Sequence, residues 1–382
     1  MSPSSNFRNK LTELQQWGTV SWIPDLSYLF YECKNLKITA TDIPDFSNVT
    51  NMYHMFYFCE SLTTIPSANS WNTGSVSNMY GMFRDAISFN QDIGNWDTHN
   101  VTNMATMFVN AYVFNKNIGS WNTGKVTSML QMFGNAKSFN QNIGAWNTSN
   151  VTDMQAMFSG ATAYNQIMGN WNTGKVTTMY GMFSNALAFN HDIGNWNTSN
   201  VTSMLVMFRD AKAFDQNIGK WPLKIGVDLT NLFTSSGMSC ENYSRTLKGW
   251  AENNITPNNI IMSAQDVKYG PAGLTHRTEL VIGKGWNISG DSFDPACILN
   301  LAANDFTNKN KSLSVYPNPV NSILNFSEEV SNIKITDVSG KVVKQNFASG
   351  KSVDIADLKK GIYIITSTTK SGDSSSKKII KD

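Results

Sequence analysis

The residues best suited to contact a ligand are polar side chains that stand directly before an isoleucine at one recurring position of the chain. Their amide and carboxylate groups can exchange hydrogen bonds with glycan hydroxyls or with polar groups of a protein. They can equally serve only to satisfy backbone groups between the coils of the repeat described below, and the sequence leaves both roles open. Ile167 interrupts the series, whose members are Asp92, Asn117, Asn142, Asp192 and Asn217.

No pattern typical of catalysis or metal binding accompanies this series. The four histidines, His54, His99, His191 and His276, fall at unrelated positions of the repeat described below. The sequence contains no His-x-x-x-His pair, no clustered cysteine ligands and no calcium-loop pattern. Its carboxylates are sparse and suggest no paired acid and base. We therefore expect a protein that is not an enzyme and that uses no metal or cofactor.

The cysteines fall into two groups. Cys33 and Cys59 each lie three residues after a phenylalanine, at a position that alanine fills in later repeats, so we expect them to be small buried side chains. Cys240 and Cys297 flank a segment outside the repeats. They either pair in an oxidising compartment or remain free, because spacing alone does not set connectivity.

Charged residues make up only 15% of the 382 residues, and their distribution is uneven. Residues 308–382 hold 12 lysines and 7 acidic residues, whereas the rest of the chain holds 18 basic and 21 acidic residues. A nucleic-acid-binding protein would carry a basic stripe on its main body, and this body is slightly acidic. No apolar run reaches the roughly 18 residues of a transmembrane helix. We expect neither a nucleic-acid partner nor a transmembrane segment.

Aromatic residues reveal the organisation of the chain. Tryptophans recur every 25 residues, and phenylalanines keep the same interval. A fixed period of this length predicts a solenoid, in which each coil buries its apolar face against its neighbours. Counting the phenylalanines from Phe30 to Phe233 gives nine coils. The tryptophans are Trp71, Trp96, Trp121, Trp146, Trp171, Trp196 and Trp221.

Each repeat combines two local patterns. In one half, the apolar residues are spaced as in a helix, which Asn100 or Thr102 is suited to cap. In the other half, the stretch from Phe89 to Trp96 suits a short strand with a turn at Gly94. The predicted fold is an α/β repeat solenoid, leucine-rich-repeat-like, with one short strand and one short helix per coil. The helix-spaced residues are Val101, Met104, Met107, Phe108, Ala111 and Phe114.

Beyond Phe233 the period ends. Tyr243, Leu247 and Trp250 share one helical face, which suits a segment that covers the last coil. Residues 313–380 hold about seven short β-rich runs separated by turn residues, which predicts a small all-β immunoglobulin-like sandwich. The predicted domains are a lead-in at 1–19, the repeat solenoid at 20–233, its C-terminal cap at 234–300, a linker at 301–311 and the sandwich at 312–382.

The repeat itself resembles a known bacterial sequence. The string F-N-Q-x-I-G-x-W-N-T-x-x-V-T-x-M-x-x-M-F-x-x-A, over roughly Val49 to Phe233, resembles the repeat of BspA-like and Mycoplasma- or Listeria-type surface proteins. The stretch Cys59-x-x-Leu62-x-x-Ile65-Pro66 resembles instead the treponemal type of leucine-rich repeat. These resemblances imply a leucine-rich-repeat-like architecture and a role as an adhesin or interaction surface.

The tail resembles the C-terminal sorting domain of type IX secretion cargo in Gram-negative bacteria. Four motifs carry the resemblance in order: LSVYPNPVNSILNF, IKITDVSGKVV, LKKGIYII and KKIIKD. It implies that residues 312–382 are handled by the type IX secretion machinery and that the protein reaches the outer cell surface. The first ten residues, MSPSSNFRNK, lack the apolar segment of a signal peptide, which predicts a trimmed chain, a fragment or a different start.

These features together predict a secreted cell-surface binding or adhesion protein. A long repetitive face suits an extended glycan or protein partner. Two alternatives stay open at the level of the sequence: a structural coat or spacer protein with no specific ligand, and an accessory module that targets an enzyme.

Overall fold

The computed structural model describes Arg8 and residues 10–297, 313, 315–337, 341–345, 348–369 and 374–382. The chain divides into two compact units, Met1–Leu299 and Asn300–Asp382. The predicted linker at 301–311 lies outside the described residues.

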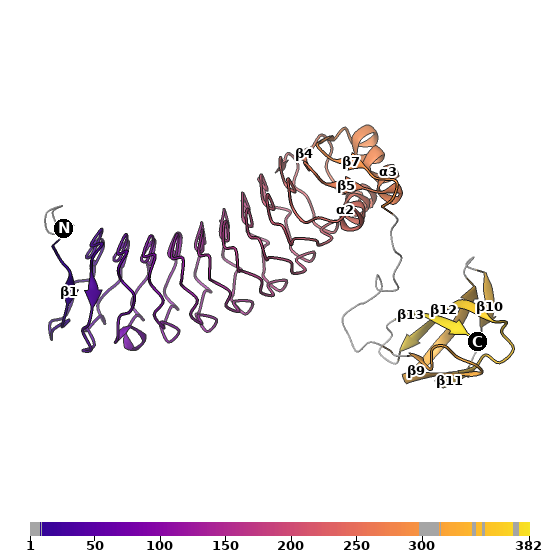
Figure 1. Cartoon of the computed structure of the whole chain (residues 1–382), viewed down its shortest axis with the longest axis horizontal. Helices are drawn as coiled ribbons and strands as arrows, with labels where there is room; N and C mark the ends of the chain where they lie inside the picture. Colours follow the sequence, from indigo (N-terminus) through magenta and orange to yellow (C-terminus); the bar gives the residue numbers. More distant parts are fainter. Residues whose placement is uncertain are drawn as a thin grey trace. The chain divides into compact units, whose positions relative to one another are not determined.

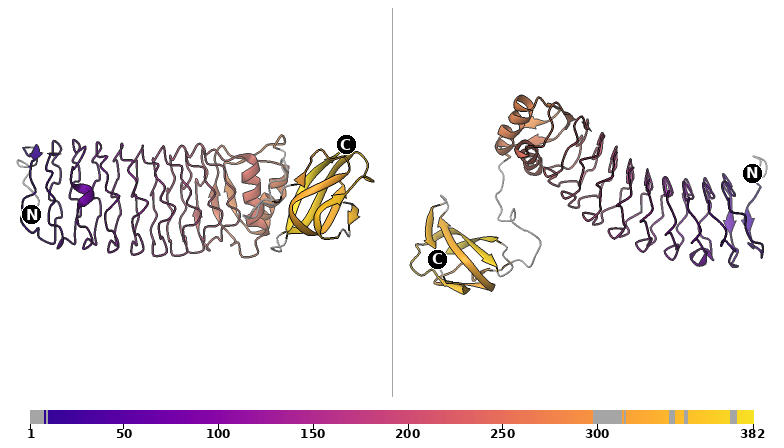
Figure 2. Two further views of the ribbon diagram at one scale, coloured as in Figure 1. Left: turned by 90° about the horizontal axis from the view of Figure 1, so that it is seen from below. Right: turned by 180° about the vertical axis from the view of Figure 1, so that it is seen from behind.

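The first unit is a single file of coils whose backbones hydrogen-bond to one another (Figure 1). One residue of each coil forms a parallel bridge with its counterpart in the next coil, so residues one repeat apart lie side by side (Figure 2). Each repeated residue type therefore becomes a column that runs along the unit. The bridged residues are Asp25, Asn51, Asn78, Asn103, Ser128, Asp153, Thr178, Ser203 and Asp228.

The helix predicted for every coil is wrong, and with it the α/β solenoid. The N–H of Met107 donates to the Met104 carbonyl of its own coil at 3.3 Å. The next N–H, that of Phe108, donates to the Met132 carbonyl of the following coil at 2.9 Å. An α-helix would keep all these bonds within its own segment. Successive tight turns also place apolar residues about three apart, which is why the sequence pattern mimics a helix.

The strand predicted in the other half of the coil is also misplaced. The bridges run through the half that was expected to be helical, while the stretch from Phe89 to Trp96 has the predicted turn at Gly94 but no strand. Two residues of each bridged half have a left-handed backbone, as at Thr106 (φ 56°) and Asn110 (φ 58°). Asn, Asp and Gly tolerate this conformation best. One of them occupies the second position in every coil from Asp85 to Asp210.

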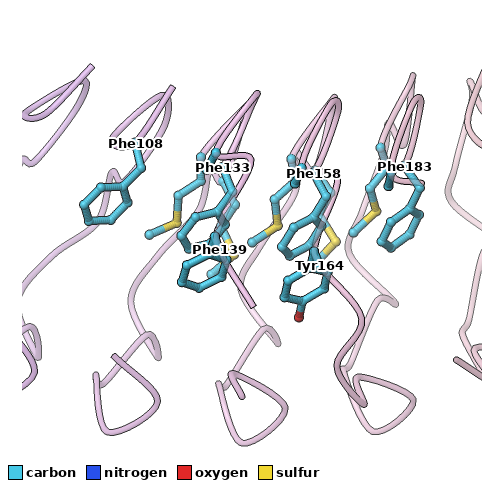
Figure 3. Close-up of a cluster of buried hydrophobic side chains, with 14 of the residues drawn as sticks. Phe108, Phe133, Phe139, Phe158, Tyr164 and Phe183 are labelled. Carbon is cyan, nitrogen blue, oxygen red and sulfur yellow. The ribbon is translucent and has the colours of Figure 1, made fainter. Parts of the chain in front are cut away.

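Aromatic columns fill the interior of the unit, and their predicted burial is confirmed. The rings of Phe133 and Phe158 stack with centroids 5.6 Å apart, and Tyr164 lies 4.1 Å from Phe158 in a second column (Figure 3). Trp121 stacks on Trp96 at 6.2 Å. Its indole N–H donates to the Ile93 carbonyl at 3.1 Å, so the column buries no unsatisfied tryptophan there.

The segment after Phe233 extends the parallel ladder. Leu229 lies opposite Met262 and Met262 opposite Ile288 in the sheet β3-β4-β6, and α2 and α3 lie at the same end of the stack of coils (Figure 1). The regular elements of the first unit are β1 (Glu13–Leu14), β2 (Lys37–Ile38), the 3-10 turn η1 (Ala68–Ser70), β3 (Asp228–Leu229), α2 (Cys240–Glu252), β4 (Ile261–Ser263), β5 (Lys268–Tyr269), α3 (Pro271–Thr278), the π-helical turn η2 (Glu279–Gly283), β6 (Asn287–Ser289) and β7 (Ser292–Phe293).

One face of α2 and two of the four cysteines are buried in the first unit, and the other two cysteines form a disulfide. Tyr243, Leu247 and Trp250 of α2 are fully buried, which confirms their shared inward face. Cys33 and Cys59 are free and buried, as expected. Of the two possibilities left open for the remaining cysteines, the structure contains the disulfide, which joins the start of α2 at Cys240 to Cys297.

The second unit is one curled antiparallel sheet with a half-barrel shape, so the predicted two-sheet immunoglobulin-like sandwich is wrong (Figure 2). Its strands are β8 (Val315–Tyr316), β9 (Ile323–Asp337), β10 (Val342–Gln345), β11 (Gly350–Asp354), β12 (Gly361–Thr369) and β13 (Ser374–Lys381). The first part of β9 pairs with β8 and β11, and its second part pairs with β10 and β12. Because one long strand runs through both halves, they belong to a single sheet. Asn332, with φ 52°, marks an irregularity within that strand.

Phe158→Ala should lower the free energy of unfolding of the coil unit by about 3–5 kcal/mol, because truncating a buried aromatic ring leaves a cavity. Phe158 is fully buried between Phe133 and Phe183. Asn150→Ala should cost about 0.5–1.5 kcal/mol, the net worth of a hydrogen bond, since Asn150 donates to the Gly124 carbonyl at 2.8 Å. Chemical denaturation measures both changes. Equal costs would contradict the inward placement of the phenylalanine column.

Candidate binding surfaces

The structure places the five predicted ligand-binding residues in one exposed row along the coils, interrupted by Ile167. Each Oδ1 accepts a hydrogen bond from the N–H of the glycine two residues later, for example at 3.0 Å between Asn117 and Gly119. All members make this contact: Asp92, Asn117, Asn142, Asp192 and Asn217. The row thus satisfies backbone groups of its own coil, whereas the second of the two roles left open placed these bonds between coils. Because its side chains are also exposed, ligand binding by the row stays a prediction.

The glycines of this row set how closely the coils approach. A Cβ on Gly119 would lie 2.5 Å from the Asn142 carbonyl oxygen of the next coil. One on Gly94 would lie 2.6 Å from the Asn117 carbonyl oxygen. Real Cβ atoms do not come this close to backbone atoms, so a larger residue would force neighbouring coils apart. The Ile-Gly pair of the repeat therefore serves the packing of the coils.

Most other repeated polar residues also hold the coils together. Asn115 Oδ1 accepts from the N–H of Asn140 at 3.0 Å, and Thr123 Oγ1 donates to the Asn147 carbonyl at 3.0 Å. These bonds recur along the unit, so the F-N-Q and W-N-T parts of the repeat belong to the fold. The residues that make them are Asn90, Asn115, Asn140, Asn165 and Asn190, and Thr73, Thr98, Thr123, Thr148, Thr173 and Thr198.

A group of aromatic rings gathers on the turns of the first three coils, at positions that belong to no motif of the repeat. Tyr31 stacks on Tyr57 with centroids 4.9 Å apart, and Tyr53 stacks on Tyr80 at the same distance. All the rings are half-buried, so part of each reaches the surface. The members of this aromatic cluster are Tyr28, Tyr31, Tyr53, His54, Tyr57, Phe58 and Tyr80.

Three cations lie over rings of the aromatic cluster. Arg8 lies 5.0 Å from the ring centre of Tyr31, Arg84 lies 5.6 Å from that of Tyr57, and Lys34 lies 5.4 Å from that of Phe58. Each cation also pairs with a carboxylate, so the cluster as a whole is close to neutral; these partners are Glu32, Asp85 and Glu60.

The hydroxyls of Tyr53 and Tyr57 stay protonated at neutral pH. Burial raises the pKa of Tyr53 to about 12, and the neighbouring Tyr28 reinforces the shift. Burial also raises the pKa of Tyr57. Neutral phenols both donate and accept hydrogen bonds. The aromatic cluster therefore combines apolar ring area, polar hydroxyls and paired charges.

The later coils show that the fold does not require these rings. Tyr53 and Tyr80 hold the same repeat position in the second and third coils. In the fourth coil this position is held by Ala105, and in the fifth by Leu130. The same inter-coil bond forms in each case: His54 N–H donates to the Tyr80 carbonyl at 2.9 Å, and Gly81 N–H donates to the Ala105 carbonyl at 2.9 Å. The sequence signal for the cluster is therefore the presence of aromatic residues at outer repeat positions where most later coils have other residue types.

Two overlapping segments of the coil unit, 24–146 and 127–250, match the family model described as Mycoplasma protein of unknown function, DUF285. Together they cover more than half of the chain. The chain belongs to the DUF285 family. The DUF285 unit is therefore the stack of coils that carries both candidate surfaces. A comparison with the curated proteins finds no match.

Residues 314–382, which include the curled sheet, match the family model described as secretion system C-terminal sorting domain. This DUF285 protein is accordingly secreted and located at the outer surface of the bacterial cell, and its sorting domain is handled by secretion machinery. No helix in the described part of the chain is long and apolar enough to cross a membrane. The described residues contain no group of three or more His, Cys, Asp or Glu side chains placed to hold a metal.

His54 is the most confined member of the aromatic cluster. Its Nε2 is buried and has no hydrogen-bond partner among the described residues. Burial, together with the positive charge of Arg84, lowers the pKa of His54 to about 4. The ring lies against the backbone of Gly81 in the next coil, where a Cβ would overlap its Cδ2 and Nε2 atoms. The glycine that follows Tyr80 therefore leaves room for the His54 ring of the aromatic cluster.

Gly81→Ala should destabilise the DUF285 unit more than Gly181→Ala. Both glycines have a left-handed backbone, with φ of 58° and 57°, so alanine costs about 1–2 kcal/mol at either position. Only at Gly81 would the new Cβ also overlap His54, whereas the nearest atom at Gly181 is Val206 Cγ2 at 3.7 Å. Adding His54→Ala should reduce the cost of Gly81→Ala to that of Gly181→Ala. Chemical denaturation of the four variants tests this, and an unchanged cost in the His54→Ala background would contradict the placement of the ring.

The stability of the DUF285 unit should fall as the pH drops from about 6.5 to about 4, in part because of His54. Its pKa is about 4 in the folded protein against 6.5 for an unperturbed histidine, so the unfolded chain binds more protons in this window. Above about pH 6.5 the titration of His54 should contribute nothing to the pH dependence of stability. In His54→Asn this contribution should vanish. Urea unfolding at several pH values, compared between wild type and variant, measures it; parallel pH curves would contradict the prediction.

Proposed function

We propose that this secreted DUF285 protein binds another protein at the cell surface through its aromatic cluster. The observation that supports this most is the gathering of the rings on the first three coils, since at the repeat position of Tyr53 and Tyr80 the later coils carry an aromatic ring only at Tyr180. Residues that a repeating fold does not need, and that partly face solvent, are available for recognition.

The chemistry of the aromatic cluster suits a protein partner. Tyrosine and arginine are enriched among the residues that dominate binding energy at protein interfaces. Tyrosine supplies a large rigid surface with a polar tip at a low cost in side-chain entropy. Stacking of Tyr31 on Tyr57 and of Tyr53 on Tyr80 holds the rings in place before a partner arrives. Because Arg8, Lys34 and Arg84 are paired with carboxylates, the favoured partner surface is mixed and near neutral rather than highly charged.

The row from Asp92 to Asn217 offers a second candidate, an extended glycan. Its amide and carboxylate groups lie exposed in neighbouring coils, and hydrogen bonds to several successive sugars would add along the row. Ile167, with 65% of its surface exposed, breaks the row in the middle and makes this candidate weaker. A spacer without a ligand, or a module that targets an enzyme, would need neither surface.

Tyr80→Ser should weaken binding to a protein partner at least about tenfold, as expected for an interface hot spot. Tyr180→Ser is a matched control, since Tyr180 occupies the same repeat position, is also followed by glycine and lies outside the aromatic cluster. Arrays of extracellular-matrix proteins and of glycans, probed with the full chain, identify the ligand, and surface plasmon resonance then gives the dissociation constants of wild type and variants.

Equal affinities of Tyr80→Ser and wild type for every protein that binds would contradict the proposal. Loss of glycan binding in Asn117→Ala/Asn142→Ala, with Tyr80→Ser unaffected, would favour the polar row instead. Absence of any ligand on both arrays would favour the spacer.

A further inference from the structure

The sorting domain carries an apolar stripe on the face of its sheet opposite to its core. Ile362 of β12 lies directly opposite Ile380 of β13, and Ile364 opposite Thr336 of β9, which in turn lies opposite Val342 of β10. The aliphatic side chains are between 37% and 42% exposed. This outer stripe, made of Val342, Ile362, Ile364 and Ile380, therefore lies on β10, β12 and β13, with Thr336 of β9 between Val342 and Ile364.

The fold of the sorting domain does not account for the outer stripe. The core lies on the opposite face, where Ile335, Ile365 and Ile379 are at most 2% exposed. One row further along the same outer face, Ser376, Thr366 and Lys334 lie side by side on β13, β12 and β9. A strand position that faces solvent accepts polar residues, as this second row shows. Four aliphatic residues gathered at one end of the face thus indicate a surface that another molecule covers.

Positive charge surrounds the outer stripe. Lys378 lies directly opposite Ile364, Lys341 directly precedes Val342, and Lys334 lies in the adjoining polar row. All three are exposed, and none forms an ion pair with a described residue. Aliphatic contact area ringed by unpaired lysines is complementary to an apolar surface with acidic residues around it.

We propose that the outer stripe is the surface through which the sorting domain docks on a protein of the secretion machinery, and that the docking site of this protein is apolar with an acidic rim. The match of residues 314–382 to a secretion sorting domain supplies the kind of partner. The lysine rim argues against a second copy of the chain, because two such faces would bring like charges together. The proposal concerns the sorting domain alone and does not depend on the function proposed for the coils.

The test uses the full chain behind a periplasmic leader in a bacterium that has type IX secretion. Ile362→Thr/Ile364→Thr removes aliphatic area and keeps β-branched residues suited to strands. The fraction of the protein at the surface, measured by antibody labelling of intact cells against the periplasmic fraction, should fall at least about tenfold, as for loss of interface hot spots. Ile323→Thr is the matched control, because Ile323 is 53% exposed on β9 but lies outside the outer stripe. It should reach the surface as wild type does.

A second variant separates docking from folding. Lys334→Glu/Lys378→Glu changes only exposed side chains and should reduce export as well, while the purified full chain keeps its thermal melting profile. Wild-type export of both double variants, or an equal loss in Ile323→Thr, would overturn the proposal. A third arm mixes purified full chain with phosphatidylglycerol vesicles. Binding that is lost in Ile362→Thr/Ile364→Thr would show that the outer stripe meets a lipid surface, and would also overturn it.

Discussion

The structure of the coil unit depends on hydrogen bonds between main chains of successive coils. In each turn segment, alternate N–H groups donate to the carbonyls of the following coil, as from Phe83 to Met107 and from Phe108 to Met132. Such bonds require the two backbones to superpose residue by residue. One inserted residue would break the register of every later bond in that segment. The unbroken interval of 25 residues from Trp71 to Trp221 is the sequence counterpart of this requirement.

Superposition of the backbones decides which side chains are left for function. Phenylalanine must follow phenylalanine in the interior, because the rings stack on one another. The alternation of Asn and Lys at one edge is equally structural: Lys125 donates to the Asn100 side chain at 2.6 Å, and Lys175 does so to Asn150 at 2.7 Å. Side chains can vary freely only at outer positions that contribute their backbone alone to the bonds repeated between coils. The aromatic cluster occupies such positions.

Burial could be predicted from the sequence, whereas hydrogen bonding could not. The tryptophan and phenylalanine columns, buried Cys59 and the inward face of α2 follow from periodicity, since repeated apolar residues must share one interior. The spacing of Met104, Met107 and Phe108 is the same whether their N–H groups bond within a helix or to the next coil. The aromatic cluster escaped detection for a related reason. A search for repeated residues passes over the positions at which the repeats differ, and Tyr53 and Tyr80 stand where Ala105 and Leu130 follow.

A ladder of parallel strands must also be brought to an end, because an unfinished edge invites pairing with other chains. The sheet β3-β4-β6 ends at β6, and there the repeating side-chain pattern gives way to a specific network. Arg277 donates to the Ile288 carbonyl of β6 at 3.1 Å and pairs with Asp291, whose carboxylate also accepts from the Tyr243 hydroxyl at 3.0 Å. Asp291 has no exposed side-chain surface, so losing either partner would leave a buried charge, which is strongly destabilising. The disulfide between Cys240 and Cys297 reinforces the same end and suits an oxidising environment outside the cell. Uniform bonds thus build the coils, and a non-repeating set of side chains stops them.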